Sequence, residues 1–177
     1  EYEMLRDLNR KRCRTFFKIP PNEYYITLTA TNAAAKTINE RELDKIDAEA
    51  HTFTAELTGE FMKTTSHFPN DEKVILKEGA QVMFVKNDQY RRWVNGTLGR
   101  IHYVADDIIS VAIDTEEGEV IHTLERETWS LQRYTYNAQE RKITSEEVGT
   151  FNQYPIKLAW AITIHKSQGK TFHKVII

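Results

Sequence analysis

The stretch that most constrains the fold lies near the end of the chain and runs YPIKLAWAITIHKSQGKTFHKVII over residues 154–177. Pro155 to Trp160 is predicted to form a short buried strand. Residues 159–168 can then wind into a helix that Gly169 ends, because glycine favours the left-handed position after a helix. A second apolar strand is predicted at 175–177. Strand, helix and strand in this order favour an α/β fold.

Polar side chains lie on two edges of that predicted helix. One edge carries Thr163, Lys166, Ser167 and Lys170. The opposite edge carries His165 and Gln168, and we interpret Trp160 and Ile164, which lie between the edges, as core residues. Helical periodicity alone favours a structural, hydrogen-bonded role for His165 over a binding role.

An earlier segment repeats the α/β pattern. Tyr24 to Thr29 is rich in β-forming residues, as a central strand requires. Thr31 or Asn32 can cap the helix that follows, in which the apolar residues are Ala35, Ile38, Leu43 and Ile46. Because ligands of α/β sheets bind at the carboxyl ends of strands, Thr31 and Asn32 are also candidates for the edge of a site. Capping explains both residues equally well.

The middle of the chain has a different pattern. Residues 51–57 predict one more strand, and 58–71 a loop or short helix. Five β-rich runs with turn signals between them follow without a helix, at 81–85, 97–104, 108–113, 120–124 and 128–134. They suggest a small barrel. Residues 141–149 are predicted to be a polar connection, after which the strand at Ile156 rejoins the α/β sheet, so that one domain interrupts another.

Composition narrows the class of protein without identifying it. The formal charge of −2 argues against a uniformly basic nucleic-acid binder, the single Cys13 cannot form an intrachain disulfide, and the six histidines lack metal-ligand spacing. No apolar stretch is long enough to span a bilayer. We therefore expect a soluble cytoplasmic protein with no membrane partner and no metal site.

Two basic segments are weaker candidates for DNA contact. Tyr90-Arg91-Arg92-Trp93 interleaves basic and aromatic residues, as single-strand binders do. A hairpin surface explains the same residues, and Asn95-Gly96 is better read as a tight turn. The second segment, Arg10 to Lys18, is better explained as a solvated helix end.

Several catalytic motifs are absent. Gly169-Lys170-Thr171 resembles the end of a phosphate-binding loop, but Ile164 stands where the first glycine is required, and the triplet follows a helix where it should precede one. Ser167 has no nucleophile elbow, and Asp114 to Gly118 lacks a calcium-loop pattern. We predict no catalytic residue within these 177 residues.

Three stretches together resemble a known family. LAWAITIHKSQGKTF at 158–172 is similar to motif V of superfamily 1B DNA helicases of the Pif-type and RecD-like group. ITLTATN at 26–32 resembles the start of their second motor domain, and LKEGAQVMFVKN at 76–87 with VNGTLG at 94–99 resembles their inserted module. The resemblance covers nearly the whole chain and is closer to the Pif-type branch.

The resemblance implies a RecA-like, P-loop NTPase-type motor domain 2A at 1–78 and 141–177, interrupted by an SH3-like 2B β-barrel at 79–140. It further implies DNA contacts by Thr163, His165 and Lys166, and it favours Thr31 and Asn32 as the edge of a site. Arg91, Arg92 and Trp93 stay weaker candidates for DNA contact on their residue types alone. Gln168, Gly169 and Lys170 are implied to lie toward the nucleotide cleft.

Activity is likewise implied by the resemblance. It predicts part of an ATP-dependent helicase that moves 5′ to 3′ on single-stranded DNA, using ATP and Mg²⁺ and a preceding RecA-like domain 1A, and that is nucleoid-associated in a bacterial cell. Both ends of the sequence look cut, so we expect a fragment that is inactive alone and binds no cofactor by itself. A RecD-like nuclease subunit and a non-catalytic DNA- or protein-binding module stay open as alternatives.

Overall fold

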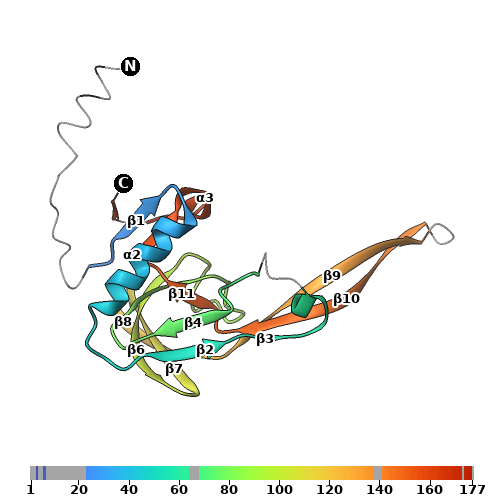
Figure 1. The fold of residues 1–177 in the computed structure, drawn as a ribbon, viewed down its shortest axis with the longest axis horizontal. Helices are drawn as coiled ribbons and strands as arrows, with labels where there is room; N and C mark the ends of the chain where they lie inside the picture. The colour runs from blue at the N-terminus through green and yellow to red at the C-terminus, as the bar shows by residue number, and fades with distance from the viewer. Residues whose placement is uncertain are drawn as a thin grey trace.

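The computed structural model describes residues 23–63, 68–137, 141–172 and 174–176, together with Glu3 and Arg6, which are both helical. The predicted basic segment at 10–18 lies outside the described residues. The described part is mixed α/β and consists mostly of strands (Figure 1).

A parallel three-stranded sheet joins the first described strand to the end of the chain. Its order is β12-β1-β13, where β1 is Ile26–Thr29, β12 is Ala161–Thr163 and β13 is Val175–Ile176. Helix α2 (Asn32–Asp44) packs against β1 and β12. The predictions of β1, α2 and β13 are therefore confirmed, and Thr31 is the N-cap residue of α2.

The predicted helix at 159–168 is largely wrong. Residues 161–163 are strand β12, and only Ile164–Ser167 (α3) are helical. The edge of β12 is bound by Asn39 of α2, which donates to Ala161 O (2.9 Å) and accepts from Ala161 N (2.8 Å). Ile164 is 48% exposed and is not a core residue, whereas Trp160 packs partly buried against the core.

Gly169 does adopt the expected left-handed conformation, with φ 73°. It occupies the third position of a turn that Lys170 N closes by donating to Ser167 O (3.1 Å). A residue with a Cβ atom is strained at this φ, so the turn after α3 favours glycine.

A second sheet is antiparallel and five-stranded, in the order β11-β5-β6-β7-β8. Its strands are β5 (Gln81–Phe84), β6 (Leu98–Ala105), β7 (Ile108–Thr115), β8 (Gly118–Leu124) and β11 (Ile156–Leu158). Apolar side chains of these strands, among them Phe84, Ile109 and Val111, are fully buried in the main core. Strand β11 pairs with β5, so the expectation that it rejoins the α/β sheet is wrong. No closed barrel is found in the described part of the chain.

Two smaller β units flank this sheet. Strands β2 (His51–Thr54) and β4 (Lys73–Leu76) pair antiparallel, and the short strand β3 (Glu56–Leu57) leads into the 3₁₀ helix η1 (Gly59–Lys63). The strand predicted at 51–57 is confirmed with a break at Ala55, and the short helix within 58–71 is confirmed.

A long hairpin projects from the body (Figure 1). It consists of β9 (Glu127–Asn137) and β10 (Lys142–Gln153), and β3 pairs with β10 near the base of the hairpin. The prediction that 141–149 is a polar connection is wrong. Tyr134 and Tyr136 are mostly exposed, so this part of the hairpin is solvated although it is regular β structure.

Candidate nucleic-acid interface

The candidate site lies where β1 and β12 end side by side. The two strands are parallel and in register from Thr27 with Ala161 to Thr29 with Thr163, so the residues after each strand meet at one edge. The Thr29 hydroxyl lies within hydrogen-bond distance of Ile162 O (3.2 Å) and Thr31 O (3.1 Å). Helices α2 and α3 both begin at this edge.

A cleft of about 540 Å³ opens beside α2. Its walls come from α2, from residues 68–75 and from residues 157–166. Three of the residues predicted to contact DNA, Asn32, Thr163 and Lys166, line it. The structure therefore brings together polar residues from the two distant ends of the described chain.

Two lysines that line the cleft, Lys157 and Lys166, form no close ion pair with a carboxylate of the described residues. Lys157 is partly buried, and burial, then the positive charge of Lys166, lowers its pKa to about 8, against a smaller opposing effect of Asp71. Within the described residues Lys157 and Lys166 have no salt bridge, whereas Lys36 pairs with Glu40 at 3.7 Å. Glu40, Asp71 and Glu72 also line the cleft, so an anion entering beside Lys157 and Lys166 would find two lysines without a close ion pair but with carboxylates nearby.

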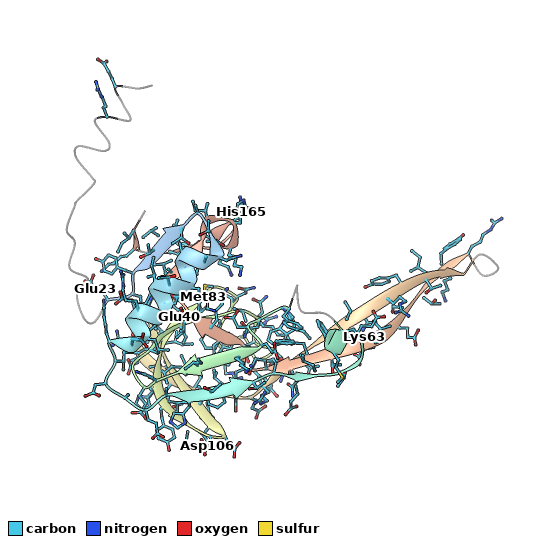
Figure 2. All side chains as sticks on the ribbon, viewed as in Figure 1. Glu23, Glu40, Lys63, Met83, Asp106 and His165 are labelled. Carbon is cyan, nitrogen blue, oxygen red and sulfur yellow. The ribbon has the colours of Figure 1, made fainter. Side chains whose placement is uncertain are left out.

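The other predicted residues of this edge differ in accessibility. Thr163 is only 6% exposed, and its hydroxyl makes no capping bond to α3. His165 is exposed at α3 on the outside of the molecule (Figure 2). The Thr31 hydroxyl accepts from Ala34 N at 3.2 Å and so acts as the helix cap.

Gln168, Gly169 and Lys170 do not line the cleft. Gln168 and Gly169 are exposed, whereas Lys170 reaches across to the turn that precedes β6. There its Nζ donates to Asn95 Oδ1, and its aliphatic stem lies so close to Gly96 that an added Cβ would be 3.3 Å away. Burial lowers the pKa of Lys170. In this structure Lys170 contacts the turn before β6 and does not face an open surface.

Arg92 and Trp93 are engaged in contacts within the protein. The guanidinium of Arg92 binds both carboxylate oxygens of Asp88, at 2.7 and 3.1 Å. The Trp93 ring is 6% exposed, stacks on Phe84 with centroids 4.4 Å apart and lies 4.4 Å from the Arg92 guanidinium. The expectation that Trp93 offers a face for stacking on a base does not agree with this burial. Arg91 is exposed.

The structure adds two residues that the sequence interpretation missed. Asn70, 7% exposed, lines the cleft and donates from Nδ2 to Tyr154 O and Ile156 O, both at 3.0 Å. Its Oδ1 is buried and has no hydrogen-bond partner among the described residues. A signal existed for Lys157, a cation inside the apolar run PIKLAW. Nothing in the sequence marks Asn70.

Other kinds of site were also considered. Within the described ranges, no group of three or more His, Cys, Asp or Glu side chains is placed to hold a metal ion. Among the same residues, no helix is both long and apolar enough to cross a membrane.

Comparisons with known proteins identify the relatives of this chain. No family model matches it. The ATP-dependent DNA helicase Pif1 of Bdellovibrio bacteriovorus is 37% identical over 142 residues, which are 77% of this chain and 29% of that protein. The crystal structure of Bacteroides Pif1 bound to ssDNA superposes with a TM-score of 0.75 at 34% identity, covering all of this chain and 39% of the other. The Bacteroides Pif1 complex with ADP-AlF4 gives the same TM-score at 35% identity, covering 89% and 35%.

The chain thus spans roughly a third of the length of the relatives it matches. Their structures imply a RecA-like helicase domain, which agrees with the parallel sheet β12-β1-β13 covered by α2. On sequence and fold together, the chain belongs to the Pif-type family of superfamily 1B DNA helicases.

Proposed function

We propose that this chain is part of the motor of an ATP-dependent DNA helicase, and that the edge where β1 and β12 end holds single-stranded DNA. One observation carries the proposal: the parallel register places Asn32 of α2 and Thr163 and Lys166 around one cleft. Relatives named as ATP-dependent DNA helicases, and a Pif1 structure bound to ssDNA, support it. They do not favour a RecD-like nuclease subunit or a non-catalytic module.

The DNA contacts would be made to phosphates. Lys166 and His165 are exposed on α3 and can donate to phosphate oxygens without rearrangement. Asn32 and Thr31 add donors at the start of α2, where backbone N–H groups and the helix dipole favour an anion. Because Thr163 is buried, we assign it a supporting role at the floor of the track. Arg91 is the remaining candidate on the loop before β6, because Arg92, although exposed, is bound by Asp88.

ATP with Mg²⁺ would bind between this chain and a preceding RecA-like domain 1A. Gln168 and Gly169 are exposed directly after α3 and would face that cleft, where they can link its occupancy to the DNA contacts of α3. The hydrogen bond from Lys170 to Asn95 would connect the segment after α3 to the turn before β6. These residues supply no phosphate-binding loop, so we expect no DNA-stimulated ATPase activity from this chain alone, and we take the 5′-to-3′ polarity from the family.

We further propose a division into domain 2A at 1–78 and 141–177 and an SH3-like 2B insertion at 79–140. The local connectivity of β5, β6, β7 and β8 supports the insertion, although β11 of domain 2A pairs with β5 at the edge of the same sheet. The β9–β10 hairpin spans residue 140 and would belong to both parts of the chain. A cytoplasmic location, at the nucleoid in a bacterial cell, goes with this function.

Binding of a fluorescent single-stranded oligonucleotide, followed by anisotropy at several salt concentrations, tests the proposal. The double variant His165→Ala, Lys166→Gln should bind more weakly and should lower the slope of log affinity against log salt by about 0.7 for each phosphate that is no longer neutralised. Lys63→Gln is the matched control, because Lys63 is exposed on η1 and far from α3 (Figure 2). An equally weakened affinity in the control would contradict the proposed DNA track.

A further inference from the structure

The cleft beside α2 is larger than contacts to the DNA phosphates require. Its volume of about 540 Å³ falls within the range of pockets that bind small ligands, which is roughly 300–1,000 Å³. A track that only binds phosphates needs exposed donors and no cavity. The lining residues therefore indicate what the extra space can accept.

Asn70 provides an acceptor of fixed direction. Its Nδ2 donates to two backbone carbonyls, those of Tyr154 and Ile156, so the amide cannot flip without losing both bonds. The Oδ1 atom consequently must accept, and within the described part of the chain it has no partner. Because a buried acceptor without a donor is destabilising, a ligand N–H group that reached Oδ1 would remove that penalty on binding.

The rest of the lining carries charges of both signs and an apolar surface, because Glu40, Asp71 and Glu72 line the cleft together with its lysines. Lys157 and Lys166 contribute positive charge without a salt bridge among the described residues. Phe68, half-buried and packed on Phe151 with ring centroids 5.4 Å apart, contributes an aromatic edge. A nucleotide combines a phosphate, a flat ring and, on the Watson–Crick edge of every base, at least one N–H donor.

We propose that this cleft seats one whole nucleotide of the bound single strand, with the phosphate near Lys157 and Lys166 and a base N–H group on Asn70 Oδ1. The inference rests on the proposed function and adds a base-binding subsite to it. Since each base presents an N–H donor, the subsite tolerates every sequence but discriminates against a sugar phosphate without a base.

The test is an NMR titration of the ¹⁵N-labelled chain with three probes: dCMP, deoxyribose 5-phosphate and inorganic phosphate. dCMP should shift the side-chain amide signals of Asn70, and the two probes without a base should not. Lys157→Gln should weaken dCMP binding about fivefold to tenfold, because one charged hydrogen bond to the phosphate is removed, while Lys63→Gln leaves the affinity unchanged. The wild-type Asn70 signal decides the result even if a variant fails to fold.

Each outcome separates this inference from the proposed function. If the single strand binds through His165 and Lys166 but dCMP leaves Asn70 unshifted, the base subsite is wrong and the DNA track stands. If dCMP shifts Asn70 while no strand binds, the cleft is a site for a free mononucleotide, and both the DNA track and the seating of a bound strand are wrong. If neither occurs, both are wrong.

Discussion

Two regions carry the basic residues considered for DNA contact, and they differ in whether a close carboxylate neutralises those residues. In the loop from Lys86 to Thr97, Arg92 is bound by a carboxylate and Trp93 is stacked on both Phe84 and Arg92. In the cleft, Lys157 and Lys166 have no salt bridge among the described residues.

The difference follows from one side chain. Asp88, whose side chain is 1% exposed, accepts from Tyr90 N, Arg92 N and the Arg92 guanidinium, so the polar groups of the loop satisfy one another. Among the described residues, no carboxylate stands as close to Lys157 as Asp88 stands to Arg92. Residue type alone therefore overestimates the binding capacity of the loop, because a basic residue is available to a ligand only when the protein does not neutralise it first.

Replacing Asp88 should have the largest effect on this comparison. Asp88→Asn removes the charge that binds Arg92 and should lower the free energy of unfolding by about 2–3 kcal/mol, since a buried carboxylate that accepts from two backbone N–H groups and from the guanidinium loses its charge. Urea denaturation measures it. Asp106→Asn is the control, because the Asp106 side chain is 99% exposed and should change stability by less than about 0.5 kcal/mol. Similar destabilisation of both variants would contradict the assigned role of Asp88.

Protonation of Asp88 at low pH should destabilise the protein in the same way as Asp88→Asn, by a smaller amount. Hydrogen bonding by the Arg92 side chain lowers the pKa of Asp88 from 3.8 to about 2. A lowered carboxyl pKa contributes stability above the unfolded value, and that contribution is lost as the pH falls from about 4 through 2. The stability difference between wild type and Asp88→Asn should shrink by about 1–2 kcal/mol over this interval. A constant difference between pH 5 and pH 2 would argue against the prediction.

In the cleft, replacing a charged residue should instead raise the free energy of unfolding. Lys157→Met removes a desolvated cation and should raise the free energy of unfolding at pH 7 by about 1 kcal/mol, while weakening DNA binding. The pKa of Lys157 is about 8 in the folded state and ordinarily 10.5, so between these pH values the folded state holds fewer protons than the unfolded state. The stability deficit of the wild type relative to the variant therefore shrinks as the pH rises from 8 to 10.5. Thermal unfolding at pH 7 and pH 9.5 measures the gain and its decrease. Lys63→Met should change neither, and destabilisation by Lys157→Met would mean that this lysine is compensated after all.

The sequence predicted most strands of the five-stranded sheet because their alternation and turns are local. It predicted the wrong structure for 161–163, where Ala161-Ile162-Thr163 fits an apolar helix face as well as a buried strand. Only the distant partners, β1 at one edge and Asn39 of α2, decide for the strand.

Strand β10 was missed because its outer part has no apolar pattern. Residues such as Glu146 and Glu147 lie in an exposed part of the hairpin, so no apolar alternation marks them. In the site, motif V and the strand ends were predictable from the pattern. The unpartnered acceptor of Asn70 was not, because its direction depends on two carbonyls that are 84 and 86 residues away.

The position of β1 between β12 and β13 also bears on how the chain folds during synthesis. Both neighbours of β1 come from residues after 160, whereas β5 to β8 pair through adjacent turns. At roughly 5–20 residues per second, the ribosome needs on the order of ten seconds between completing β1 and completing β12. Throughout that interval β1 exposes two unpaired edges, so the parallel sheet is completed late, after the hairpins of the five-stranded sheet can form.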